Sequence, residues 1–272
     1  MCYHRAMRWL VVLALAGGFA GPAHFSDQLA EARRLYNSGQ YEAAEKLARQ
    51  ELEIPGSVDA ARVVLARVQL ERYRQSADAD DLAAARESLR LVNPLSLESR
   101  EQVEYTIGLG ETLYLTDQFG AAAQLFESVL IRSSVLGPSA HERVLDWWAT
   151  AVDRNAQARP VEERAAAYTV VLDRMREEIA EYPGSTAAAY WLAAAARGAG
   201  DLEGAWQAAL AGWVRASMTE DRGAALRADL ERLVVQAILP ELSARLQRGG
   251  DTRQALSAML AEWKAFKEAW TR

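Results

Sequence analysis

The sequence contains little cysteine, histidine or proline. Of its 272 residues, one is cysteine, three are histidine and seven are proline. The single cysteine, Cys2, cannot form a disulfide within the chain, so the fold depends on side-chain packing. Few prolines leave room for long helices, and the abundant alanine, leucine, glutamate and arginine favour helix. Because no stretch shows the sustained alternation of a half-buried strand, we expect an all-α fold.

The sequence also lacks the short motifs that mark common catalytic sites. It has no HExxH zinc-protease motif, no GxSxG serine-hydrolase motif and no glycine-rich phosphate loop after a strand. His141 adjoins Glu142, but neighbouring residues on a helix point in different directions. We expect His141 to be a solvated histidine at the start of a helix.

Acidic residues are plentiful, and two carboxylates are sufficient for glycosidase chemistry without any motif. Adjacent acids such as Glu162-Glu163 and Glu177-Glu178 more often cap helices or lie on solvated faces. The spacing around Asp80-Asp81 is not that of a calcium-binding loop. We therefore expect a protein that is not an enzyme, with no catalytic residue, no metal site and no cofactor.

The first 23 residues have the three-part layout of a secretory signal. Two arginines precede an apolar run at residues 9–16, and small residues follow, with cleavage expected after Ala20 or Ala23. The run is short for a membrane span. The alternative, an uncleaved N-terminal anchor, would be the chain's only contact with a membrane. We expect an exported protein, periplasmic or secreted.

The charge of the remaining chain disfavours two classes of partner. Without residues 1–23, 29 basic residues face 37 acidic ones, a net charge of −8. Affinity for nucleic acid comes chiefly from basic residues that neutralise phosphates. An acidic surface is equally unsuited to anionic lipid. We expect neither nucleic acid nor an anionic membrane surface as a partner.

Residues 99–138 read as a helical hairpin. In the first half, Ile107, Gly110 and Tyr114 recur at three- and four-residue steps, the spacing of one helix face. Asp117 interrupts the pattern and is the expected N-cap of a second helix. Ala122 and Gly110 are small where a large side chain would hold the two helices apart. Such a unit has an apolar face that it cannot bury alone, so it needs neighbours.

Similar hairpins are expected at residues 25–54, 57–92 and 185–217, with a longer pair at 139–181. Prolines punctuate the chain at intervals of 39, 44 and 45 residues. Expected N-terminal features are a Ser57 cap, a capping box of Ser139 with Glu142, Pro160 in the first turn of a helix, and an Asp201 cap. Beyond residue 217 the hairpin does not repeat, Pro240 is expected to break or kink a helix, and a last amphipathic helix begins at Asp251.

The central hairpin resembles the tetratricopeptide repeat, because Leu109-Gly110, Phe119, Ala122, Phe126 and Pro138 occupy the places of that repeat's pattern. The resemblance implies a right-handed α-solenoid of about five hairpins over residues 24–217. Residues 218–272 would then be helices that cap the open end of the stack.

The resemblance also implies a concave surface, lined by the first helix of each hairpin, that contacts a protein or peptide partner. Trp147 and Trp148 diverge by about 100° on a helix, so one of them is expected to face this groove. Trp206 and Trp213, on one stripe, are expected in the core. The positions that the resemblance places in the groove, together with Trp147, are Leu29, Arg33, Tyr36, Ile107, Glu111, Tyr114, Tyr190, Ala194 and Arg197.

The main functional hypothesis is a non-catalytic scaffold for protein–protein interaction in the bacterial cell envelope. One alternative is an accessory subunit that takes part in outer-membrane assembly or associates with peptidoglycan, similar to the tetratricopeptide lipoproteins. Unlike those lipoproteins, the chain has no cysteine after the apolar run. Another is a helical subunit of a glycan-processing enzyme. Only about fifty residues follow residue 217, fewer than the usual size of a separate catalytic domain.

Overall fold

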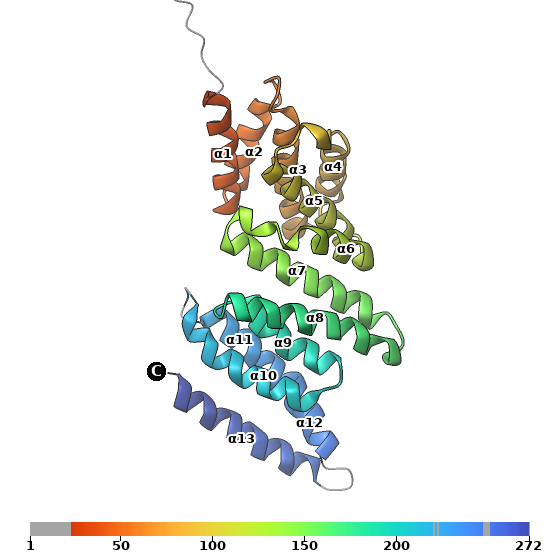
Figure 1. Ribbon diagram of the computed structural model, residues 1–272, viewed down its shortest axis with the longest axis vertical. Coiled ribbons are helices and arrows are strands. Elements are labelled where there is room, and N and C mark those ends of the chain that lie inside the picture. Colours follow the sequence, from red (N-terminus) through yellow and green to blue (C-terminus); the bar gives the residue numbers. More distant parts are fainter. Residues whose placement is uncertain (1–22, 220, 222, 247–250, 272) are drawn as a thin grey trace, which may run out of the picture.

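Helical hairpins follow one another along the chain (Figure 1). The computed structural model describes residues 23–219, 221, 223–246 and 251–271, and these contain no strand, so the all-α prediction is confirmed for them. The paired helices are α1 (Ala23–Asn37) with α2 (Tyr41–Glu51), α3 (Val58–Ser76) with α4 (Ala79–Arg90), α5 (Ser99–Tyr114) with α6 (Phe119–Leu130), α7 (Pro138–Gln157) with α8 (Val161–Glu181), and α9 (Thr186–Gly198) with α10 (Leu202–Arg215).

The hairpins stack through successive neighbours. Each helix from α1 to α11 (Ala224–Leu233) packs on the next, and the first helices also pack on one another: α1 on α3, α3 on α5, α7 on α9 and α9 on α11. No comparable close packing joins α5 to α7. Figure 1 shows α1 to α6 in one half of the molecule and α8 to α13 in the other, with α7 lying across between them.

Small residues let neighbouring helices approach closely, both within a hairpin and between hairpins. A Cβ atom on Gly110 of α5 would lie 2.6 Å from the Phe126 ring of α6. A Cβ atom on Gly198 of α9 would lie 2.4 Å from the Tyr168 ring of α8. Both distances are shorter than carbon atoms tolerate without movement, so glycine is required for these ring contacts. The predicted role of Gly110 is confirmed.

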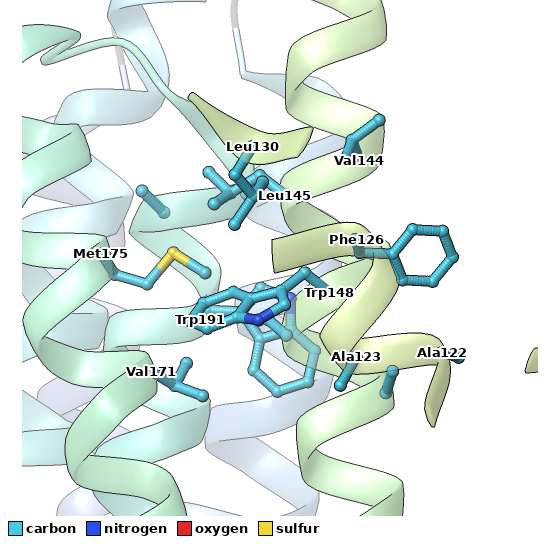
Figure 2. Packing of buried hydrophobic residues seen from close by; sticks show 14 of the residues in the cluster. Ala122, Ala123, Phe126, Leu130, Val144, Leu145, Trp148, Val171, Met175 and Trp191 are labelled. Carbon is cyan, nitrogen blue, oxygen red and sulfur yellow. The ribbon is translucent and has the colours of Figure 1, made fainter. Parts of the chain in front are cut away.

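The largest apolar cluster joins the third, fourth and fifth hairpins. Trp148 of α7 is almost fully buried, and Figure 2 shows it between Met175 and Val171 of α8 on one side and the α6 residues on the other. Trp191 of α9 lies in the same cluster, and its Nε1 donates a hydrogen bond to Asp146 of α7 at 2.8 Å. The long helices α7 and α8 are therefore part of the stack.

A second apolar cluster covers the end of the stack. Its centre is Trp263 of α13 (Thr252–Trp270), whose ring contacts Trp206 and Trp213 of α10 edge-on at centroid distances of 5.7 and 5.0 Å. The prediction that Trp206 and Trp213 belong to the core is confirmed. The Nε1 of Trp263 donates to Glu231 of α11 at 2.8 Å, which fixes α13 against the neighbouring helix.

Several predicted helix starts are corrected. Asp117 adopts a left-handed conformation with φ 59° in the turn, and α6 starts one residue later, after Gln118. Ser57 precedes α3 as expected, but its hydroxyl donates to the carbonyl of Glu51 instead of capping the helix. The caps at Asp201 and Asp251 are confirmed, because each carboxylate accepts a hydrogen bond from the first turn that follows it.

The capping box of Ser139 with Glu142 does not form. Helix α7 begins at Pro138, after Gly137, with no side-chain cap. The Glu142 carboxylate instead accepts hydrogen bonds from the Ala187 amide and the Thr186 hydroxyl of α9, both at 2.9 Å. The Glu142 carboxylate, which would complete a capping box within α7, thus bonds to the next hairpin instead.

Pro160 differs from expectation, whereas Pro240 lies beside an interruption of the α-helix, in line with the predicted break. Pro160 stands just before α8 as its N-cap, outside the first turn. Pro240 lies inside α12 (Leu239–Leu246), and the chain passes from α11 into α12 through a π-helical turn at Val234–Ile238. A proline lacks the N–H of the helical ladder, and a π-helical turn is a common way to accommodate such a defect.

The hairpin predicted at residues 57–92 has a long first helix. The first helix of this pair, α3, continues to Ser76, and Ala77 ends it in a left-handed conformation with φ 57°. The expected secretory signal over residues 1–23 lies, up to residue 22, outside the described residues. No helix among the described residues is long and apolar enough to cross a membrane.

Candidate functional site: a pocket between α5 and α7

Residues of α5 and α7 line a pocket. It has a volume of about 210 Å³. Helix α5 with its C-cap residue and helix α7 supply three lining residues each, and α3 and α6 supply one each. The lining residues are Arg74, Glu111, Tyr114, Leu115, Phe126, Asp146, Trp147 and Thr150.

Aromatic rings occupy the base of the pocket. Phe126 packs on Gly110 on one side and on the Trp147 ring on the other, with a centroid distance of 5.9 Å. Figure 2 shows the Phe126 ring pointing away from Trp148 and Met175. Trp148 is buried while Trp147 is half-buried, as expected for neighbouring residues on one helix. Trp147 is therefore the less buried of the two tryptophans, and the expectation that one of them faces a partner groove stays a prediction.

Glu111 is a buried acid in the wall of this pocket. Its side chain is 5% exposed, and its Oε2 atom has no hydrogen-bond partner among the described residues. Burial raises the pKa of Glu111 to about 7, against the opposite effect of Arg67 and Arg74. Burial of a carboxylate oxygen without a hydrogen-bond donor costs free energy. A donor that reached this atom would remove that cost.

Asp146 supplies a second carboxyl group from α7. It is half-buried, and burial raises its pKa although the hydrogen bond from Trp191 acts in the opposite direction. A carboxylate has about four lone-pair sites, so the Trp191 bond leaves acceptor capacity. The pocket thus has an acid from α5 and an acid from α7.

Arg74 also lines the pocket. Its guanidinium lies 5.7 Å from the centroid of the Trp147 ring and donates to Glu71 at 2.8 Å. Tyr114, on the α5 wall, is half-buried and meets the Phe119 ring edge-on at 5.3 Å. These contacts place a cation against an aromatic ring in the lining of the pocket.

The pocket brings together three of the residues expected in the groove, Glu111, Tyr114 and Trp147. Three others, Leu29, Tyr36 and Ile107, are at most 5% exposed and lie in the packing between hairpins. The expectation that they line an open surface is therefore corrected. Leu29 and Tyr36 pack in apolar clusters with α2 and α3, and Ile107 packs in the large cluster that joins the third to fifth hairpins.

Arg33 also has an internal role. It donates to Glu101 and Glu104 of α5, both at 2.9 Å, and so links α1 to α5. Glu104 is nearly fully buried and also pairs with Arg67 of α3 at 3.7 Å. The Arg67 guanidinium in turn lies over the Tyr36 ring, 4.3 Å from its centroid. This group of charges holds the first three hairpins together.

The predicted positions of α9 lie away from the pocket. Tyr190 is half-buried against the Trp191 ring, edge-on at 5.5 Å, and Ala194 is half-buried in the same cluster. Arg197 donates to Glu241 of α12 at 3.0 and 2.6 Å. The sequence did not lead us to expect four of the residues that line the pocket, Arg74, Leu115, Asp146 and Thr150. The helical spacing of Glu111 to Leu115 and of Asp146 to Thr150 was the available signal.

His141 is buried, which corrects the expectation of a solvated histidine. Its Nδ1 is 2.7 Å from the Ser133 hydroxyl, and its Nε2 is 2.9 Å from Oε1 of Glu178. Ser133 is fully buried, and its hydroxyl also lies 2.8 Å from the Leu130 carbonyl. The three residues form an internal hydrogen-bond network that joins α7 to α8, with no open nucleophile.

Comparison with family models, curated proteins and solved structures finds no match to this chain. Among the described residues, no group of three or more His, Cys, Asp or Glu side chains is placed to hold a metal ion. The stacked hairpins and the pocket between α5 and α7 are therefore the features from which a function can be inferred.

Proposed function

We propose that this chain is a non-catalytic scaffold of the tetratricopeptide-repeat type that binds a protein partner in the bacterial cell envelope. The hairpins would form a right-handed solenoid whose first helices face the partner. The observation that carries the proposal is the pocket between α5 and α7. It holds Glu111, Tyr114 and Trp147, three residues that the repeat pattern and the tryptophan spacing place on the partner-facing side.

The size and lining of the pocket support a polypeptide ligand. Pockets for cofactors and drug-sized ligands usually have volumes of about 300–1,000 Å³. At about 210 Å³ this pocket is smaller, and it suits one anchoring side chain of a larger partner. Tyrosine and tryptophan at its walls are the residue types that most often dominate binding energy at protein interfaces. The location in the envelope rests on the signal-like residues 1–23.

Proximity labelling in the native cell tests this function. A labelling enzyme fused to the C-terminus of the wild-type chain would be compared with the same fusion carrying Trp147→Ala, in separate envelope and cytoplasmic fractions. We expect the wild-type chain to label at least one envelope protein that the Trp147→Ala chain does not label.

A matched control is Trp270→Ala, because Trp270 is 53% exposed on α13 and lies outside the pocket lining. It should leave the labelled proteins unchanged. Circular dichroism of each purified variant would verify that the fold is retained. Identical labelling by all three chains would overturn the binding role of the pocket, and a chain found only in the cytoplasm would overturn the envelope location.

A further inference from the structure

One carboxylate oxygen in the lining of the pocket has no hydrogen-bond partner. Oε2 of Glu111 is buried without a hydrogen-bond partner among the described residues. Neither nearby arginine of α3 donates a hydrogen bond to this atom: Arg67 has a long contact with Glu104 at 3.7 Å and a buried Nε without a hydrogen-bond partner among the described residues, and Arg74 donates to Glu71. A ligand that brings a hydrogen-bond donor to Glu111 would remove this unfavourable burial, whereas an apolar ligand would preserve it.

The pKa of Glu111 also indicates that the nearby arginines do not fully offset its burial. Arg67, Arg74 and Arg143 lower it while Glu71 raises it, yet burial holds the pKa at about 7. The surrounding arginines therefore do not compensate for the burial of this acid. A cation placed in direct contact would favour the ionised carboxylate strongly.

The aromatic residues of the pocket are suited to a cation. The chain already places the guanidinium of Arg74, a lining residue, 5.7 Å from the centroid of the Trp147 ring. Arg74 is held there by an exposed contact with Glu71, which can rearrange easily. Tyr114, also in the lining, gives the entering chain a second ring face.

The charged residues of the lining disfavour an anionic ligand. Two of the three are acids, Glu111 and Asp146, and the third, Arg74, already donates to Glu71, so a phosphate or carboxylate would meet more negative than positive charge. The volume of about 210 Å³ limits the occupant to one side chain. Lysine and arginine combine a cationic head with an apolar stem that packs along aromatic rings.

On the basis of the proposed function, we propose that the pocket takes one lysine or arginine side chain of the partner, whose stem lies between Tyr114 and Trp147 and whose cationic head donates to Glu111. Asp146 would accept a second hydrogen bond from the same head. The pocket is thus a specificity site for a basic residue within the partner's sequence.

A selection from a display library of random linear peptides tests the inference on the purified full-length chain. We expect the selected peptides to share a lysine or arginine at one position. Replacement of that residue by norleucine, which keeps the apolar stem without the charge, should weaken binding about tenfold or more.

The variant Glu111→Gln should weaken binding of the same peptides about tenfold or more, because it removes the charge at nearly constant shape. Glu162→Gln is the matched control: Glu162 is exposed on α8 and does not line the pocket, so its loss should change affinity less than twofold. Equal weakening by the two variants would point to the overall charge of the chain and would overturn the inference.

The outcomes separate this inference from the function on which it rests. Peptides that bind through Trp147, as shown by loss with Trp147→Ala, but that require no basic residue would overturn the basic-residue site and leave the scaffold function standing. The same holds for peptides that bind Glu111→Gln as tightly as the wild-type chain. If no peptide is selected, or if every selected peptide is insensitive to Trp147→Ala, both proposals are overturned.

Discussion

The Phe126 ring lies so close to Gly110 that a Cβ atom at that glycine would be 2.6 Å from its Cε1. This contact positions the floor of the pocket, since Phe126 also touches Trp147. The same residue pair thus sets both the spacing of α5 and α6 and the shape of the candidate site.

We predict that Gly110→Ala destabilises the protein by about 1–2 kcal/mol. The overlap with a fully buried ring costs about 1–3 kcal/mol, and the better helix propensity of alanine offsets up to about 1 kcal/mol of it. Urea unfolding followed by circular dichroism measures the difference. The double variant Gly110→Ala, Phe126→Leu should lose less than the sum of the two single variants, because the smaller side chain removes the overlap. Strict additivity would contradict the contact.

Much of the fold was predictable from the sequence because the apolar period is regular. The hairpins around Gly110, Phe126 and Ala122 have the three- and four-residue spacing that fixes one buried face. The repeat pattern also supplied Glu111 and Tyr114, and the adjacency of two tryptophans supplied Trp147. These features are local, so they can be read from neighbouring positions along the chain.

The predictions that were wrong or missing share a different cause. His141 and Glu142 look like helix-start residues, yet they bond to Glu178 and to Thr186 and Ala187, 37 to 45 residues away. Asp146 and Arg74 line the pocket together with Glu111 although they come from α7 and α3. Local periodicity says which residues form a helix face, but the spacing between stacked hairpins depends on all their side chains together.

The buried carboxyl group of Glu111 gives a pH dependence with a defined sign. Its pKa is raised from an ordinary value of 4.5 to about 7, so between these values the folded state holds a proton that the unfolded chain has lost. Stability from this group is fully present below pH 4.5 and is lost as the pH rises through about 7. The Glu111→Gln variant lacks this titration. The difference in free energy of unfolding, variant minus wild type, should therefore be about 2 kcal/mol larger at pH 8 than at pH 5.

Denaturant unfolding of both chains at pH 5, 6, 7 and 8 would measure this difference. The difference between variant and wild type isolates Glu111 from other groups that titrate in the same range. Glu162→Gln serves as the control, with no change in its difference from wild type across that range. A constant difference for Glu111→Gln would show that the acid is ionised in the folded protein.

Arg33 and Arg34 offer a comparison of a buried and an exposed charge on one helix. Arg33 bonds two carboxylates of α5, and one of these, Glu104, is nearly fully buried. Arg34 pairs with Glu31 across a single turn at the surface, with 62% of its side chain exposed. Removal of Arg33 leaves a buried carboxylate with weaker contacts to Arg67 and Arg100, at 3.7 and 3.4 Å.

We therefore predict that Arg33→Ala lowers the free energy of unfolding by about 3 kcal/mol, the range for breaking a buried pair. Arg34→Ala should change it by less than about 1 kcal/mol, as for an exposed pair. Equilibrium urea titrations of the two variants measure both values. Similar losses for the two variants would mean that the charge contacts between α1 and α5 do not stabilise the stack. Added salt should reduce the smaller effect more than the larger one.

The end of the stack depends on Trp263 of α13. Its ring is 1% exposed and contacts Trp206, Trp213 and Phe266, while its Nε1 bonds Glu231. Truncation of a fully buried tryptophan costs about 3–5 kcal/mol, so Trp263→Ala should destabilise the protein by about that amount. Trp270→Ala, on the same helix but 53% exposed, should cost less than about 1 kcal/mol.

Amide hydrogen exchange distinguishes a cap from an independent helix. If α13 covers the apolar face of α10, Trp263→Ala should speed exchange in α10 and α11 while α1 to α4 keep their protection, because stacked hairpins lose stability mainly at the neighbouring unit. Uniform loss of protection along the whole chain would show that the stack unfolds as one unit. Unchanged exchange in α10 would show that α13 does not stabilise the helices on which it packs.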